Sequence, residues 1–104
     1  MTTSRITALE EMLTREPNDV TTYYMLGTEY FKAQMYDQAV ATLRRYLAIA
    51  NDEGAVYRML AQSFLRLGKF EEAQQAYSDG LAAATRHGHQ PMIEEYTQAL
   101  KDLG

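Results

Sequence analysis

Apolar residues recur along this chain at steps of three and four positions, and polar residues fill the positions between them. This spacing places the apolar residues on one face of an α-helix, which has 3.6 residues per turn. No stretch has the alternating valine- and isoleucine-rich pattern of a strand. The sequence therefore predicts an all-α chain of about six helices, at residues 4–15, 20–33, 37–50, 55–67, 70–86 and 91–103.

Proline, glycine and aspartate mark several of the predicted helix boundaries. Pro17 disfavours the helical conformation in the residue before it, so the first helix should end there. Asp19, or Thr21 just after it, is suited to cap the start of the next helix. Gly68 fits the position just after a helix, where a positive φ carries no steric penalty for glycine, and Gly88 should end the fifth helix.

The segment 20–53 returns, position for position, as the segment 54–87, an offset of 34 residues. A fixed period of this length is typical of stacked helical repeats, which usually bind other molecules rather than catalyse reactions. The motif reads Tyr23-x-x-Leu26-Gly27-x-x-Tyr30, then Ala39 and Leu43, in the first copy, and Tyr57-x-x-Leu60-Ala61-x-x-Phe64, then Ala73 and Tyr77, in the second.

These residues resemble the tetratricopeptide repeat, whose pattern over 34 residues is W-x2-L-G-x2-Y, then A-x3-F, then P. The chain departs from it by Tyr23 for Trp and by Ala61 for Gly. The resemblance implies a right-handed α-α superhelix, a single domain over 1–104 and a non-catalytic scaffold. Its expected parts are an N-terminal half-repeat or capping helix at 1–19, repeats at 20–53 and 54–87, and a C-terminal capping helix at 90–104.

Small residues are expected where the two helices of a repeat cross. Gly27 and Ala61 should allow a close approach, with Ala39 and Ala73 opposite them. A larger side chain at these positions would push the two backbones apart.

In the tetratricopeptide repeat family, the first helix of each repeat lines a concave groove that receives an extended peptide or a helix of a partner. The chaperone-binding subfamily has Lys and Asn where this chain has Tyr24 and Thr28, so we expect no binding of chaperone tails. The corresponding groove positions in this chain are Tyr24, Thr28, Phe31, Lys32, Arg58, Gln62, Leu65 and Arg66.

The chemistry of these groove positions predicts a protein or peptide partner with acidic and hydrophobic residues. Two alternatives stay open. Met25 and Met59 either face this ligand or pack between repeats. The cations Lys32, Arg58 and Arg66 either bind it or are ordinary solvated surface.

Composition and charge argue against several other functions. The chain has no cysteine, which excludes disulfides, thiolate metal sites and cysteine nucleophiles. Its net charge of −4 argues against binding nucleic acid or an anionic membrane. No stretch approaches the ~20 apolar residues of a membrane span or resembles a signal peptide. With no phosphate-binding loop or nucleophile motif, we predict a cytoplasmic protein that is not an enzyme and needs no cofactor.

Two short motifs invite a chemical interpretation. His87 and His89 lie two residues apart, but a stable metal site needs more ligands, so we predict no metal site and expect a histidine to interact with a helix C-terminus. The pairs Glu71-Glu72 and Glu94-Glu95 are expected to stabilise helix starts rather than to catalyse.

A second hypothesis is a self-associating structural protein. The half-repeat at 1–19 would leave an apolar stripe of Ile6, Leu9 and Leu13 exposed at the end of the array. A second copy would cover it, giving a homodimer, because symmetric pairing is the commonest oligomeric arrangement. The sequence leaves open whether residues 1–19 pack on their own chain or on a neighbour.

Overall fold

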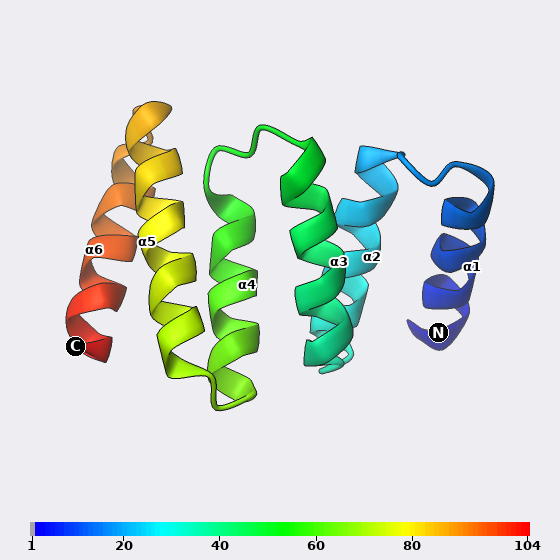
Figure 1. Cartoon of the computed structure of the whole chain (residues 1–104), viewed down its shortest axis with the longest axis horizontal. Helices are drawn as coiled ribbons and strands as arrows, with labels where there is room; N and C mark the ends of the chain where they lie inside the picture. The colour runs from blue at the N-terminus through cyan, green and yellow to red at the C-terminus, as the bar shows by residue number, and fades with distance from the viewer. Residues whose placement is uncertain (1) are drawn as a thin grey trace. The chain divides into compact units, whose positions relative to one another are not determined.

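The chain is all-α in a computed structural model, which describes residues 2–104, with side chains from Ser4 onward. The described residues form six helices, each within two residues of its predicted bounds (Figure 1). The first three and the last three form two compact units, with the boundary between Asn51 and Asp52. The helices are α1 Thr2–Arg15, α2 Val20–Lys32, α3 Tyr36–Ile49, α4 Ala55–Arg66, α5 Phe70–Arg86 and α6 Gln90–Leu103.

Aspartate side chains fix the start of the first helix in each repeat. The carboxylate of Asp19 accepts a hydrogen bond from the backbone N–H of Thr21 at 3.2 Å, so of the two expected caps of α2 the structure has Asp19. Asp52 accepts from the backbone N–H groups of Gly54 and Val56 at 2.8 and 3.2 Å, at the start of α4. Both caps satisfy N–H groups that have no partner within the helix.

The core of the N-terminal unit joins α1 to α2 and α3. Ile6 and Leu9 of α1 are only 6% and 4% exposed, and Leu13 packs against the same cluster. The expectation of an exposed apolar stripe at this end is therefore wrong. The stripe of α1 meets the apolar face of α2 within the same chain. The buried members of the cluster are Ile6, Leu9, Leu26, Tyr30 and Ala39.

Polar contacts also hold α1 against α2. The hydroxyl of Tyr30 donates a hydrogen bond to the Glu10 carboxylate. Burial, followed by this contact, raises the pKa of Tyr30 to about 12. The guanidinium of Arg5 lies 3.4 Å from the nearly buried carboxylate of Glu29. α1 is thus anchored by apolar and polar contacts together.

Gly27 lies where α2 and α3 approach closely, as predicted, but the residue opposite it differs. A Cβ at Gly27 would lie 2.5 Å from Cδ2 and 2.9 Å from Cγ of Leu43, so a larger residue would displace that side chain. Leu43 stands one helical turn after Ala39 on the same face of α3. Ala39 packs in the cluster with Leu26 and Tyr30 of α2. The residue nearest to Gly27 is therefore Leu43, where the sequence predicts Ala39.

The C-terminal unit is organised around Tyr96 of α6, which is completely buried. Its hydroxyl donates a hydrogen bond to the backbone carbonyl of Gly54. Its ring packs where Gly80 of α5 has no side chain. A Cβ at Gly80 would lie 2.8 Å from both Cε2 of Tyr96 and Cβ of Tyr57. Because Gly80 has no side chain, the ring of Tyr96 can pack against α5 and hold α6 in place.

Candidate peptide-binding face

The eight predicted groove residues form two sets on two helices. We call Tyr24, Thr28, Phe31 and Lys32 of α2 the α2 row, and Arg58, Gln62, Leu65 and Arg66 of α4 the α4 row. Within each row the spacing is i, i+4, i+7 and i+8, which places all four residues along one face of their helix. Each row lies within one of the two compact units.

The α2 row presents one aromatic ring and one amine to solvent. The side chain of Tyr24 is 41% exposed, and its ring centroid lies 5.5 Å from that of Tyr46 in a tilted arrangement. Lys32 is exposed, with Nζ 3.6 Å from the Glu29 carboxylate. The hydroxyl of Thr28 donates to the carbonyl of Tyr24 at 2.9 Å, so only its acceptor capacity remains for a ligand.

Phe31 contributes more to the core than to the open surface of the α2 row. It is half-buried against the α1–α2 cluster and meets Tyr36 edge-on, with ring centroids 5.9 Å apart. Met25 also packs against this cluster, so for this methionine the packing alternative holds. Tyr24 is consequently the principal exposed apolar group of the α2 row.

The α4 row begins with an ion pair to the last helix. Nε of Arg58 lies 2.5 Å from Oε2 of Glu95, and a terminal guanidinium nitrogen donates to Oε1 at 2.7 Å. Both side chains are 40% exposed. This is the bidentate geometry by which arginine recognises carboxylates. The alternative of an ordinary solvated cation therefore does not describe Arg58.

The ion pair changes the proton affinity of both partners. The hydrogen bond from Arg58 lowers the pKa of the Glu95 carboxyl, although partial burial opposes that change. The hydrogen bond to Glu95 raises the pKa of Arg58, again against the effect of burial. Both groups therefore remain charged throughout the neutral pH range.

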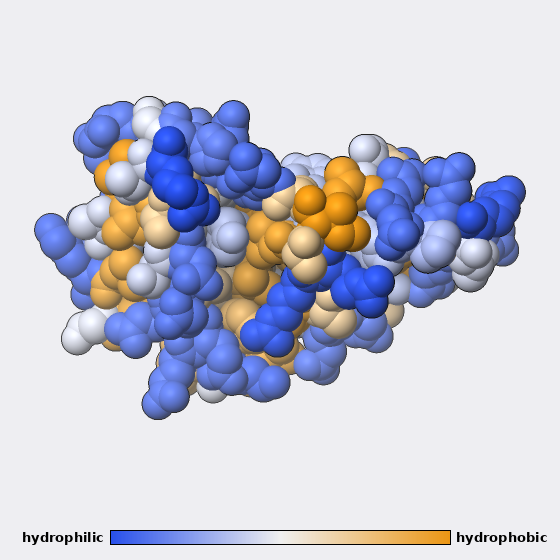
Figure 2. Space-filling view, turned by 45° about the horizontal axis from the view of Figure 1, so that its top comes forward, coloured by the Kyte–Doolittle hydropathy of each residue, from blue (hydrophilic) through white to orange (hydrophobic). Residues whose placement is uncertain are grey.

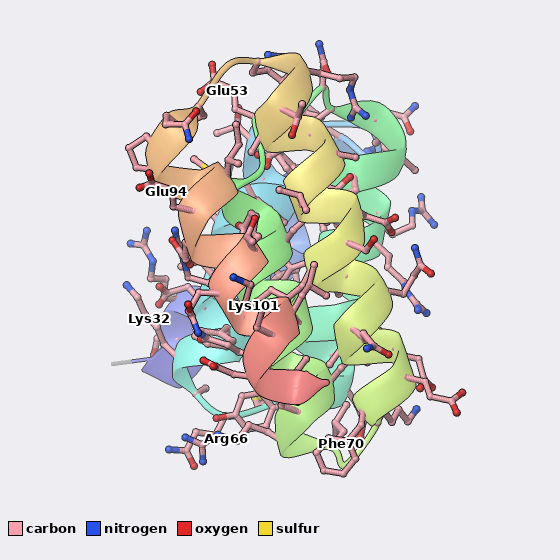
Figure 3. All side chains as sticks on the ribbon, turned by 90° about the vertical axis from the view of Figure 1, so that its left-hand side faces the viewer. Lys32, Glu53, Arg66, Phe70, Glu94 and Lys101 are labelled. Carbon is pink, nitrogen blue, oxygen red and sulfur yellow. The ribbon has the colours of Figure 1, made fainter. Side chains whose placement is uncertain are left out.

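The rest of the α4 row is open to solvent. Gln62 and Arg66 are exposed, and Leu65 is half-buried. Arg66 and Phe70 lie at the same end of the C-terminal unit, where Phe70 is 64% exposed (Figure 3). Phe70 stands one 34-residue period after Tyr36, and this equivalence gives no sign that Phe70 is exposed.

Surface hydropathy is mixed on the face that Figure 2 displays. Apolar side chains reach the surface there in patches among mostly hydrophilic ones (Figure 2). No helix within residues 2–104 is long and apolar enough to cross a membrane. Among the described side chains, the large apolar ones with the greatest exposure are Met12, Tyr24, Ile49 and Phe70.

The two histidines lie at helix ends, where one of them caps a helix start. Nδ1 of His89 accepts a hydrogen bond from the backbone N–H of Met92 at 3.4 Å, so His89 caps the start of α6. His87 is the residue just after α5 and is exposed. In the described part of the chain, no three His, Cys, Asp or Glu side chains are grouped closely enough to hold a metal ion.

Glu95 is the site residue whose role the sequence did not reveal. The sequence predicts that Glu95 stabilises a helix start together with Glu94, whereas it pairs with Arg58. One signal was present, because Glu95 stands one period after Ala61 and two periods after Gly27. A charged residue at a position that favours small residues indicated a separate role.

Six helices with a 34-residue repeat and exposed rows on the first helix of each pair define a helical-repeat protein of the tetratricopeptide type. The family model described as "Anaphase-promoting complex, cyclosome, subunit 3" matches residues 1–80, and the chain belongs to this family.

Named relatives agree with the family assignment. The chain is 29% identical over 98 residues to the TPR repeat-containing protein PA0015 of Pseudomonas aeruginosa, covering 94% of this chain and 93% of the relative. The solution structure of protein BPP2914 from Bordetella parapertussis superposes with a TM-score of 0.78 at 28% identity, over 94% of this chain and 85% of that one.

A more distant structure shows the same fold. MamA MSR-1 gives a TM-score of 0.73 at 22% identity, over 98% of this chain and 65% of that one. The tetratricopeptide repeat fold generally mediates interactions between proteins, and the family is generally non-catalytic.

Proposed function

We propose that this protein is a non-catalytic, cytoplasmic protein-interaction module whose α2 row and α4 row each bind acidic and apolar segments of partner proteins. The observation that carries the proposal is the bidentate Arg58–Glu95 pair. It supports a carboxylate-binding role for the α4 row, because one carboxylate already fits its first arginine. Tyr24 supplies an exposed aromatic contact and Arg66 a second cation.

An array of synthetic peptides that vary in acidic and apolar content tests the proposal. The parent chain should retain acidic peptides, and Arg66→Glu should lose them, because the charge of an exposed row member is reversed. Lys69→Glu is the matched control, since it makes the same charge change in the turn outside the row. Equal retention by all three proteins would place binding elsewhere, and no retention by the parent would argue against linear peptide ligands.

Self-association is not favoured by a specific observation. The apolar stripe on which that hypothesis rested, Ile6, Leu9 and Leu13, packs within the chain. Light scattering of the parent chain at high concentration measures this directly. A stable homodimer would support self-association as an additional property of the protein.

A further inference from the structure

The Arg58–Glu95 pair is well formed in geometry and open to solvent. Its two hydrogen bonds of 2.5 and 2.7 Å are bidentate, yet both side chains are 40% exposed. Exposed ion pairs contribute little net stability, because water solvates the separated charges nearly as well. A carboxylate from another molecule can therefore replace Glu95 at small cost.

Other contacts hold α6 in place without this pair. Tyr96 is completely buried, donates its hydroxyl to the carbonyl of Gly54 and fills the space beside Gly80. Burial of an aromatic ring stabilises a fold far more than an exposed ion pair does. Release of Glu95 should thus free Arg58 without detaching α6.

We propose that Glu95 is a built-in competitor, occupying a carboxylate position of the α4 row that an acidic side chain of a partner takes over. The inference rests on the proposed function and adds its regulation and the spacing of the ligand. Arg58 and Arg66 are eight residues apart, or ~12 Å along the helix axis. An extended chain advances ~3.3 Å per residue, so two acidic residues about four positions apart match the two arginines.

The spacing defines a probe peptide, Glu-Leu-Ser-Leu-Glu, with Gln-Leu-Ser-Leu-Gln as its uncharged control. Glu95→Gln removes the competing charge and keeps the shape of the side chain. Glu94→Gln is the matched control, since it removes the same charge from the neighbouring position, whose side chain projects outward from α6 (Figure 3). Fluorescence anisotropy of the labelled peptides at ~0.15 M salt limits long-range charge effects.

We expect Glu95→Gln to bind the acidic probe about two- to five-fold more tightly than the parent, the factor that corresponds to an exposed ion pair. Glu95→Ala should give the same gain. Glu94→Gln should match the parent. In an Arg58→Gln background, Glu95→Gln should not tighten binding of the acidic probe, because the guanidinium for which the two carboxylates compete is absent.

The outcomes separate the two proposals. If the parent binds the acidic probe and Glu95→Gln binds it no more tightly, the proposal that Glu95 competes is overturned, and the proposed interaction surface stands. An equal gain in Glu94→Gln would also overturn it, since net charge alone would then explain the effect. If the parent and both variants fail to bind the acidic probe, the proposed spacing of the ligand is rejected. If the peptide array also retains no peptide, the proposed function itself is rejected.

Discussion

At the residue scale, Gln34 and Gly68 occupy equivalent positions one 34-residue period apart, in the turn after the first helix of each repeat. Both have positive φ, 61° for Gln34 and 74° for Gly68. Glycine adopts this conformation freely, whereas the Cβ of glutamine costs about 1 kcal/mol there. We expect Gln34→Gly to raise the free energy of unfolding by about 0.5–1 kcal/mol in urea denaturation.

Gly68→Gln is the reverse experiment at the equivalent turn. No neighbouring atom lies within 4 Å of a Cβ added there, so its effect reports backbone conformation alone. The free energy of unfolding should fall by a similar amount, about 0.5–1 kcal/mol. If both substitutions shifted stability in the same direction, the conformation of these turns would not be the controlling quantity.

At the element scale, α1 is held to the N-terminal unit mainly by its buried apolar face. Leu9 is 4% exposed, whereas Met12 on the same helix is 37% exposed. Leu9→Ala should lower the free energy of unfolding by about 2–5 kcal/mol. Met12→Ala should change it by less than about 0.5 kcal/mol. Amide hydrogen exchange should accelerate along α1 only in Leu9→Ala, and equal acceleration in both variants would contradict this docking.

The helices were predictable because each is set by local periodicity. The bounds of α5 were predicted to the residue from its apolar spacing and from Gly88, which has a φ of 66°. Contacts between helices were not predictable from the sequence, because they depend on crossing geometry that no local pattern encodes. The sequence indicated that Gly27 allows close approach, but only the structure identifies Leu43 opposite it.

The candidate site also has features that the sequence predicts and contacts that only the structure shows. Periodicity and the resemblance placed the α2 and α4 rows each on one helix face, since helical spacing alone determines this. Phe31 is half-buried against a cluster with members from α1, α2 and α3, and Arg58 pairs with Glu95 of α6. The role of Arg58 therefore depends on a contact between helices, which helical spacing alone does not encode.

At the scale of the whole molecule, alkaline pH should act on both compact units through buried tyrosines. Burial is the largest cause that raises the pKa of Tyr30 to about 12 in the N-terminal unit and of Tyr96 to about 12 in the C-terminal unit. The ordinary tyrosine value is 10.0. Between these values the unfolded chain loses a proton from each residue while the folded chain retains it.

The sign of the stability change follows from this difference in bound protons. A raised folded pKa gives stabilisation that is fully present below pH 10 and is lost as the pH rises towards 12. Each of the two tyrosines should contribute a slope of up to about 1.4 kcal/mol per pH unit in this window. Urea denaturation across the window measures the slope, and tyrosinate absorbance should show late titration of both groups.

Tyr30→Phe and Tyr96→Phe should each flatten the slope, because phenylalanine has no proton to lose. An unchanged slope in both variants would mean that other groups, such as the lysines, control alkaline unfolding of this protein.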